Sequence, residues 1–301
     1  MKRACCLLLL SALCQFASAG KPPYQIRRID SGTIAFQGQI VKGSRQHLLA
    51  QLDSATTTLI VTSEGGSAEE GILIAQDLRK RNIQLIVEKY CLSSCANYLF
   101  LAAPQKSVNA HSLIGFHGAP LGSLSAEKEQ EFQRGNLNSR SMRGQGLQNH
   151  LDRLAIRELE FFAEIGVDRS LYRTVDSLIL AAVPAASKTV TLQGKLTLKT
   201  RARQWEFGVS DQELETLGRK MAELDRKKLG YALRGHIERA GTAPNTAYFP
   251  SRATLEKYGV LGIGNYPYPA NDAELQNLVR DVFDKDVHII ADFAAPEPPA
   301  G

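Results

Sequence analysis

The sequence predicts an α/β fold, because strand-like and helix-like segments alternate through its first half. The β-branched run TTTLIVTS ends at a pair of glycines, and the apolar runs IQLIVEKY and SLIGFHG follow as two further strands. Between the strands lie an amphipathic helix that ends near Arg81 and the short apolar helix CANYLFLAA. This alternation over residues 56–118 is typical of parallel crossovers, which bring the loops after the strands to one edge of the sheet.

The amphipathic character of the first of these helices depends on five residues. They recur at spacings that place them on one helical face, and they are Gly71, Ile72, Ile74, Ala75 and Leu78. Upstream, YQIRRIDSGTIAFQGQI predicts two short strands joined by a Ser-Gly turn, and a helix begins near Ser44.

The second half of the chain changes character. Residues 121–148 are polar and contain several glycines, which predicts a surface loop or lid. A periodic helix follows over 151–166, then KTVTLQGKLTLKTRARQWEF as a pair of strands. Residues 210–240 predict a long charged helix with Ser210 as its cap, and the tail DFAAPEPPAG is rich in proline and predicts disorder.

The amino terminus has the pattern of a secretory signal peptide. Lys2 and Arg3 precede an apolar run, and small residues end at Ala19, so we expect residues 1–19 to be removed on export. No other apolar run reaches the length of a membrane span, so we expect no stable membrane span in the mature chain. Of the 36 basic residues 34 then remain beside 31 acidic ones, a balance that gives no indication of nucleic-acid binding.

The glycine pair lies where a strand passes into a helix. Backbone N–H groups at a helix N-terminus attract an anion, and glycine lets the backbone approach a ligand closely. Taken alone, Gly65 and Gly66 are more typical of a simple tight turn. Ser93 and Ser94 come at the end of the next strand, and His117 comes at the end of the one after. Together they predict a nucleophile, a base and an oxyanion hole at one sheet edge, although a serine pair there can also be a simple helix cap.

These residues resemble the Clp-type serine peptidases and their relatives within the crotonase-like superfamily. The resemblance rests on SEGGSAEEG, on the strand-to-helix run SSCANYLFLAA, on LIGFHG, and on a later block, FPSRATLEKYGVLG. It points most closely to exported, uncharacterised Clp-like proteins that carry a Cys-x-Ser-x-Cys motif. It covers residues 56–120 and a short block near Tyr258, and the region between them diverges.

The resemblance implies a fold, a domain plan and an assembly. The core would be a Clp/crotonase-like spiral of repeated β-β-α units over residues 20–270, with a flexible insertion at 121–148 and a divergent, largely helical C-terminal region. The divergent part would cover 185–245, and residues 271–301 would form a C-terminal extension that ends in the disordered tail. Members of the superfamily often assemble as trimers or stacked rings, so the resemblance also implies a homo-oligomer.

The resemblance leaves the nucleophile open. Counting from Gly66 without gaps places the Clp serine at Cys95, whereas the Cys-x-Ser-x-Cys form indicates Ser93, and Ser94 lies between them. We rank Ser93 first, Ser94 second and Cys95 third, because export exposes a free thiol to oxidation. The third member of the triad is missing, since Ala247 occupies the position of the Clp aspartate.

The predicted function is that of an exported serine hydrolase, a Clp-like peptidase acting on peptide or protein substrates in the periplasm. Ser-His acyl transfer needs no cofactor and no metal. The rival hypothesis is a catalytically decayed Clp-like fold that binds a peptide or protein, and Ala247 is the feature that favours it. Asn245 or Thr246 would have to orient His117 in the active alternative, unless the site works as a dyad.

Two further sets of residues bear on this site. Cys91 and Cys95 are the cysteines that remain after signal removal, and in an oxidising compartment they can either pair as a disulfide or stay as two buried thiols. Lys89 and Lys106 are possible bases, because signal-peptide-peptidase relatives use a lysine, but neither lies in a matching motif.

Overall fold

The computed structural model describes residues 22–117, 124–140, 142, 147–182, 191–208, 211–240, 245–282 and 287–292. The predicted signal peptide, the predicted cap at Ser210 and the proline-rich tail lie outside the described residues.

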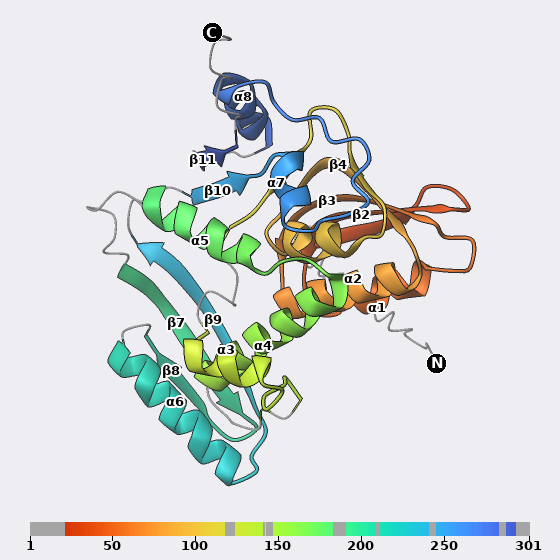
Figure 1. The fold of residues 1–301 in the computed structure, drawn as a ribbon. Helices are drawn as coiled ribbons and strands as arrows, with labels where there is room; N and C mark the ends of the chain where they lie inside the picture. Colours follow the sequence, from red (N-terminus) through yellow and green to blue (C-terminus); the bar gives the residue numbers. More distant parts are fainter. Residues whose placement is uncertain are drawn as a thin grey trace, which may run out of the picture.

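A six-stranded sheet forms the centre of the molecule (Figure 1). Its strands are β1 (Tyr24–Arg28), β2 (Thr33–Ile40), β3 (Thr58–Gly66), β4 (Gln84–Leu92), β5 (Lys106–Val108) and β6 (Leu113–Gly115). The order is β1-β2-β3-β4-β5, and β6 also pairs with β4. Only β1 is antiparallel to its neighbour among these strands. The prediction of an α/β fold with a parallel-sheet core is confirmed.

Strands β5 and β6 share one side of β4. Leu85 to Val87 of β4 pair with β5, and Tyr90 to Leu92 pair with β6. The sequence predicted one strand over SLIGFHG and missed β5. The shared strand brings the C-terminal ends of β4 and β6 together, with Leu92 opposite Gly115.

Helices cover the sheet and complete its core. They are α1 (Ser44–Gln51), α2 (Ala68–Lys80), the π-helix η1 (Cys95–Phe100), α4 (Leu147–Ile165) and α5 (Ser170–Ala182). Ser67 caps α2 by accepting a hydrogen bond from the Glu70 N–H, and all five residues of the predicted apolar face are buried. Tyr98, Phe161 and Tyr172 are among the largest fully buried side chains of this core.

The predicted surface loop at 121–148 contains a helix. This helix, α3 (Ala126–Gln133), is capped by Ser125. Glu129 is buried. Its Oε1 lies 3.0 Å from a guanidinium nitrogen of Arg169, and its other carboxylate oxygen forms an ion pair with Arg173 of α5. These two ion pairs fix α3 to the helical layer, which the polar composition alone did not indicate.

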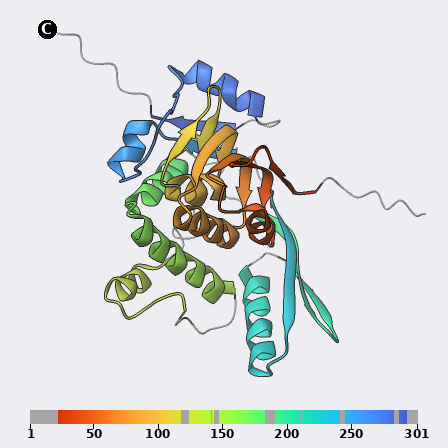
Figure 2. The ribbon, with the colours of Figure 1, turned by 90° about the vertical axis from the view of Figure 1, so that its right-hand side faces the viewer.

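A second, antiparallel sheet lies apart from the first (Figures 1 and 2). It consists of β7 (Thr191–Thr200), β8 (Gln204–Phe207) and β9 (Tyr231–Ala240), in the order β8-β7-β9, and α6 (Asp211–Arg226) packs on it. A small core of its own includes Leu198, Leu217 and Met221. The prediction of one helix over 210–240 is therefore wrong in its second half: Lys228 has a positive φ, and the chain after it pairs with β7 instead of continuing α6.

The C-terminal elements return to the first sheet. They are β10 (Asn245–Phe249), α7 (Arg252–Lys257), α8 (Asp272–Val282) and β11 (Val287–Ala291), with β10 and β11 parallel. Phe249 of β10 and Leu275 of α8 share a buried cluster with Leu92 and Leu113. The cluster places these elements directly behind the ends of β4 and β6.

Candidate functional site

Ser93 occupies a strained turn between β4 and η1. Its φ is 52°, in the left-handed region that side chains other than glycine rarely adopt. The turn is held on both sides, because the Ser93 N–H donates to the Gly115 carbonyl at 3.0 Å and the Asn97 N–H donates to the Ser93 carbonyl at 2.7 Å. Ser93 is half-buried. Strain of this kind persists where the surroundings enforce it, and it clusters at functional sites.

The glycine pair packs against this turn. Gly65 has a φ of 88°, and a Cβ on it would lie 2.5 Å from the Leu92 carbonyl oxygen and 2.8 Å from the Ser93 Cβ. Gly66 has a φ of 140°, and its Cβ would lie 2.3 Å from the Ile40 carbonyl oxygen. Both positions therefore need glycine for steric reasons, whatever chemistry the site performs. The structure also shows that Gly65 and Ser93 lie in direct contact across β3 and β4.

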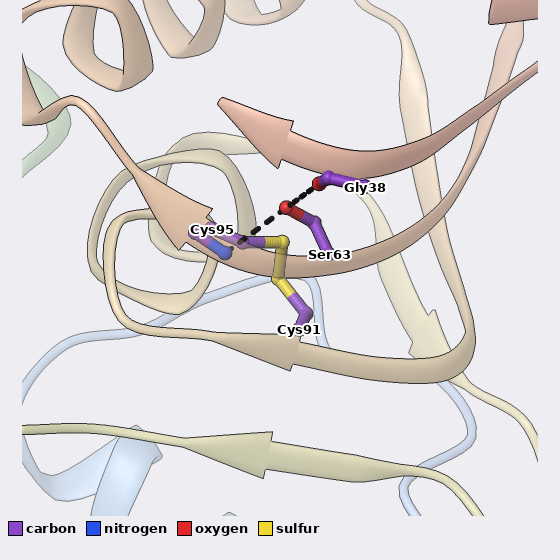
Figure 3. The surroundings of a disulfide bond; sticks show 5 residues. Gly38, Ser63, Cys91 and Cys95 are labelled. Carbon is purple, nitrogen blue, oxygen red and sulfur yellow. Dashed lines mark hydrogen bonds between the residues drawn. A yellow bond between two sulfur atoms is a disulfide. The ribbon is translucent and has the colours of Figure 1, made fainter. Parts of the chain in front are cut away.

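The N–H of Gly65 already has a partner. It donates to Ser63 Oγ at 3.1 Å, and the Ser63 hydroxyl donates to the Gly38 carbonyl at 2.6 Å (Figure 3). Ser63 is fully buried. Of the two predicted oxyanion-hole residues, this leaves Gly66 as the candidate donor.

Ser94 and Ser93 differ in what their hydroxyls do. Ser94 is buried, and its Oγ donates to the Gly66 carbonyl at 2.7 Å. Because the Ser94 hydroxyl is used in this hydrogen bond between the turn and the glycine pair, its role is structural. Ser93 is the more accessible of the two serines and holds the strained backbone, so the geometry favours Ser93 over Ser94 as the candidate nucleophile.

Cys91 and Cys95 form a disulfide that brackets the turn (Figure 3). Both cysteines are fully buried, and Cys91 pairs with Ser63 of β3. The alternative of two separate thiols is thus excluded in this structure. Cys95 has no thiol to offer as a nucleophile.

His117 lies on the same edge of the sheet as Ser93. It comes two residues after Gly115, and the Gly115 carbonyl accepts a hydrogen bond from the Ser93 N–H. Phe116 fixes this segment by exchanging two 2.8 Å backbone hydrogen bonds with Tyr248 of β10. His117 is an exposed residue. Catalytic hydrogen bonds often tighten only when substrate binds, so an exposed histidine remains suited to the role of base.

The strand next to His117 is β10, where sequence reasoning looked for the third member of a triad. Thr246 and Ala247 directly precede Tyr248, the residue that pairs with Phe116. Ala247 packs in the apolar cluster behind β4 and β6, and the side chain of Asn245 lies outside the described residues. The residue that the sequence resemblance aligns with a triad carboxylate is therefore an alanine whose side chain packs in this cluster.

A buried polar network behind the turn was missed from the sequence. The Tyr98 hydroxyl of η1 donates to the carboxylate of Glu158 on α4, and the Tyr172 hydroxyl donates to the Asn97 carbonyl at 3.0 Å. Burial, reinforced by the nearby Glu158 charge, raises the pKa of both tyrosines well above the usual value, so both stay protonated. The sequence LDRLAIRELEFFAEIG contained one indication of this network, because Glu158 interrupts an otherwise apolar helical face.

Lys106 is buried, but it is far from the turn. Burial, with the charge of Arg79 adding to it, lowers the pKa of Lys106 to about 7, and its Nζ donates to the Leu101 carbonyl at 2.9 Å. It pairs with Leu85, seven residues before Leu92 on the same strand. At about 3.3 Å per residue this is roughly 23 Å from the end of β4, so Lys106 cannot act as the base of Ser93. Lys89 is exposed.

Within the described residues, no group of three or more His, Cys, Asp or Glu side chains has the arrangement of a metal site. The same part of the chain has no helix with the length and apolarity that a membrane span requires.

No protein-family model and no curated protein matches this chain. Among solved structures, the chain is similar to a mutant ClpP1 from Listeria monocytogenes, with 16% identity over 63% of this chain and 88% of that one, at a TM-score of 0.34. It is also similar to the enoyl-CoA hydratase from Bacillus anthracis, with 11% identity over 38% of this chain and 58% of that one, at a TM-score of 0.28. A probable enoyl-CoA hydratase/isomerase from Mycobacterium abscessus matches at 11% identity over 48% of this chain and 67% of its own length, at a TM-score of 0.25. At these TM-scores the likenesses carry no argument about the reaction.

Proposed function

We propose that this chain is an exported serine hydrolase with Ser93 as nucleophile and His117 as base. The observation that carries the proposal is the left-handed backbone of Ser93 at a strand-to-helix turn, with two glycines packed against it. A sharp turn of this kind exposes a serine hydroxyl at a helix N-terminus, which is how nucleophile elbows work. The position of His117 at the end of the adjacent strand gives the second group that the reaction needs.

The proposed chemistry is acyl transfer. His117 removes the proton of the Ser93 hydroxyl as Oγ forms a bond to a substrate carbonyl carbon. The N–H groups of Gly66 and Ser94 stabilise the resulting oxyanion. The tetrahedral intermediate then expels the leaving amine or alcohol, which takes the proton from His117. Water, activated by the same ring, releases the acyl group from Ser93 and restores the free hydroxyl.

The substrate and setting belong to the proposal as well. The motif resemblance supports a peptide or protein substrate, and the signal-peptide pattern at the N-terminus supports action in the periplasm. Because members of the superfamily that the chain resembles often form oligomers, a homo-oligomer is part of the proposal. The mechanism uses neither cofactor nor metal. Ala247 in place of a triad carboxylate implies slow turnover, because changing that carboxylate in a model triad lowers the rate about 10⁴-fold.

A second candidate function is retained, because a specific observation favours it. Ala247 packs in an apolar cluster, so the site lacks an orienting carboxylate at that position. A fold with this defect can keep its glycine turn and bind a peptide without cleaving it. The two candidates differ in whether Ser93 reacts.

A fluorophosphonate probe tests the proposal on purified mature protein. We expect labelling of the wild type, loss of labelling in Ser93→Ala and in His117→Ala, and retention in the control variant Ser31→Ala at an exposed turn serine. Circular dichroism would establish that each variant is folded. An unlabelled wild type, or labelling that survives Ser93→Ala, would contradict the proposal, and in the first case peptide binding would support the rival.

A further inference from the structure

The second sheet and its helix end together in a basic tip. Thr200, the last residue of β7, is paired with Tyr231, the first residue of β9, so the β7–β8 turn and the turn after α6 lie side by side. Figures 1 and 2 both show this end of α6 and of the second sheet turned away from the six-stranded sheet. We define the basic tip as residues 199–206 and 220–231.

The basic tip carries more net positive charge than the whole mature chain. Its two segments contain seven basic and three acidic residues, a net charge of +4. The predicted mature chain has 34 basic and 31 acidic residues, so the residues outside the tip are slightly acidic in sum. Six basic residues of the tip are exposed: Lys199, Arg201, Arg203, Arg226, Lys227 and Lys228. The positive charge of the chain is therefore concentrated and exposed at one end of the second sheet.

Local contacts account for only part of this charge. Glu223 lies 2.7 Å from both Lys220 and Lys227, so its carboxylate is shared between two cations. The partial negative charge at the end of α6 also favours cations there, but this effect falls off within the last turn of a helix. Arg201 and Arg203 belong to the β7–β8 hairpin, where no helix end favours them. The hairpin cations thus call for an explanation outside the helix.

Helix α6 ends with a lysine in a position that is usually glycine. Lys228 has a φ of 52°, and the Leu229 N–H donates to the Leu224 carbonyl at 2.9 Å. This is the pattern of a Schellman cap, whose left-handed residue is commonly glycine because a side chain is strained there. The chain keeps a cation at the tip in spite of this strain. Backbone strain of this kind is often retained for function.

An apolar side chain lies among these cations. Leu229 is 50% exposed and directly follows Lys228. A single exposed leucine is common on soluble proteins and indicates nothing by itself. An exposed leucine beside clustered cations, however, is typical of surfaces that bind lipid, because the leucine enters the headgroup region while the cations attract anionic headgroups. A nucleic acid would attract the same cations through its phosphates, but it gives Leu229 no apolar layer to enter.

We propose that the basic tip docks on the surface of a membrane that contains anionic lipids, with Leu229 in the headgroup region. The exposed cations of both turns supply the attraction, and each one near such a surface adds to the affinity. The docking is peripheral, and in the part of the chain that the structure describes no helix could span a membrane. The inference does not depend on the hydrolase proposal, because no residue of the tip takes part in the Ser93 chemistry.

Co-sedimentation of the purified mature protein with lipid vesicles tests this proposal. One set of vesicles is phosphatidylcholine alone, and the other contains about one-third phosphatidylglycerol, which is anionic. We expect binding to the anionic vesicles that is at least about tenfold tighter at about 50 mM salt and that weakens at about 300 mM salt through screening. Equal binding to both kinds of vesicle, or no binding to the anionic vesicles at the lower salt concentration, would overturn the proposal.

Variants assign the binding to the basic tip. The double variant Arg201→Glu, Arg203→Glu should bind anionic vesicles at least about tenfold more weakly than the wild type. The control double variant Lys89→Glu, Arg280→Glu makes the same change in net charge at two exposed residues outside the tip and should retain most of the binding. Lys228→Gly relieves the strained backbone, so it should be at least as stable as the wild type and still lose about fivefold in affinity.

Two further measurements separate a lipid surface from other anionic partners. Leu229→Ser keeps every cation, and it should weaken vesicle binding by about threefold or more because the apolar contact is lost. A double-stranded DNA of about 20 base pairs should bind more weakly than the anionic vesicles at the same salt concentration. Tighter binding of the DNA, unchanged vesicle binding of Leu229→Ser, or equal vesicle binding of the tip variant and the control variant would contradict the proposed docking.

Discussion

At the scale of single residues, the left-handed backbone of Ser93 allows the proposed role of its hydroxyl to be tested apart from its effect on stability. A residue with a side chain in the left-handed region costs about 1–2 kcal/mol relative to glycine. Ser93→Gly should therefore raise the free energy of unfolding slightly, or leave it unchanged, while abolishing probe labelling. Urea unfolding beside labelling measures both properties. A Ser93→Gly variant that is destabilised by more than about 1 kcal/mol would mean that the hydroxyl has a structural role.

Gly65 offers a sharper test of packing at the same turn, because Gly43 is its natural control. The two glycines have φ values of 88° and 93°, yet a Cβ on Gly43 meets nothing within 4 Å. Gly43→Ala should cost about 1–2 kcal/mol of stability for the backbone alone, and Gly65→Ala should cost a further 1–3 kcal/mol for overpacking against the Leu92 carbonyl. Equal losses in urea unfolding would mean that the contact between Gly65 and the turn is loose.

Sequence reasoning placed Ser93, His117 and the glycine pair on one sheet edge, because strand ends and turns are readable from pattern. It could not tell that the Gly65 N–H donates to Ser63, nor that Ser94 Oγ donates to Gly66. Hydrogen bonds of this kind depend on the local backbone path and on strand register, which no sequence pattern contains.

At the scale of elements, the disulfide is expected to shape the turn more than it stabilises the fold. Cys91 and Cys95 are four residues apart, so closing this loop contributes at most about 2 kcal/mol through the unfolded chain. A Cys91→Ser, Cys95→Ser double variant should lose up to that amount of stability and a larger share of its probe labelling rate. Unchanged labelling kinetics in a folded double variant would show that the disulfide does not position Ser93.

The hydrogen bond between Tyr98 of η1 and Glu158 of α4 should contribute measurably to the stability of the fold. Tyr98→Phe leaves the buried Glu158 carboxylate without the Tyr98 donor, whereas Tyr172→Phe removes only a donor to the Asn97 carbonyl. We expect Tyr98→Phe to cost about 1–3 kcal/mol or more, and Tyr172→Phe to cost about 1 kcal/mol. Thermal and urea unfolding compare them directly. If Tyr98→Phe loses less free energy of unfolding than Tyr172→Phe, other groups compensate the Glu158 charge.

Elements with a strong period were predicted well, and those that depend on distant partners were not. The apolar face of α2 is buried at every predicted position, since a 3.6-residue period is a local property. The strand β9 was predicted as helix, because its charged sequence has no clear alternation and its pairing partner β7 lies some forty residues earlier. Helix α5 was not predicted, and its packing on the core defines it.

At the scale of the whole molecule, Lys106 makes stability depend on pH. Its pKa is lowered to about 7 in the folded protein from an ordinary value of 10.5, so between these values the unfolded chain binds more protons. The free energy of unfolding should therefore rise with pH across this window, by up to about 1.4 kcal/mol per pH unit. Below about pH 7 both states are protonated and this contribution is constant.

The Lys106 effect is isolated by comparing two lysine variants. Urea unfolding of Lys106→Met between about pH 7 and pH 9 should lack the rise seen in the wild type. Lys89→Met, at an exposed lysine, should keep it. A wild type and a Lys106→Met variant with parallel pH profiles would mean that the Lys106 charge is well solvated or compensated.

The overall architecture was partly predictable from the alternation of strands and helices. That alternation fixed the α/β class, and it placed the candidate site at the strand ends. The sharing of β4 by β5 and β6, and the return of β10 to pair with Phe116, connect segments up to about 130 residues apart. Such contacts arise from packing of the whole chain, so they could not be derived from local sequence.

Mass-spectrometric mapping of the fluorophosphonate adduct tests the central claim most directly. We expect a single modified peptide that contains KYCLSSCANY, with the adduct on Ser93 and none on Ser94 after reduction of the Cys91–Cys95 disulfide. Pre-incubation with a peptide substrate should slow the modification. An adduct on another residue, or the absence of any adduct on folded wild-type protein, would contradict the claim that Ser93 is a nucleophile.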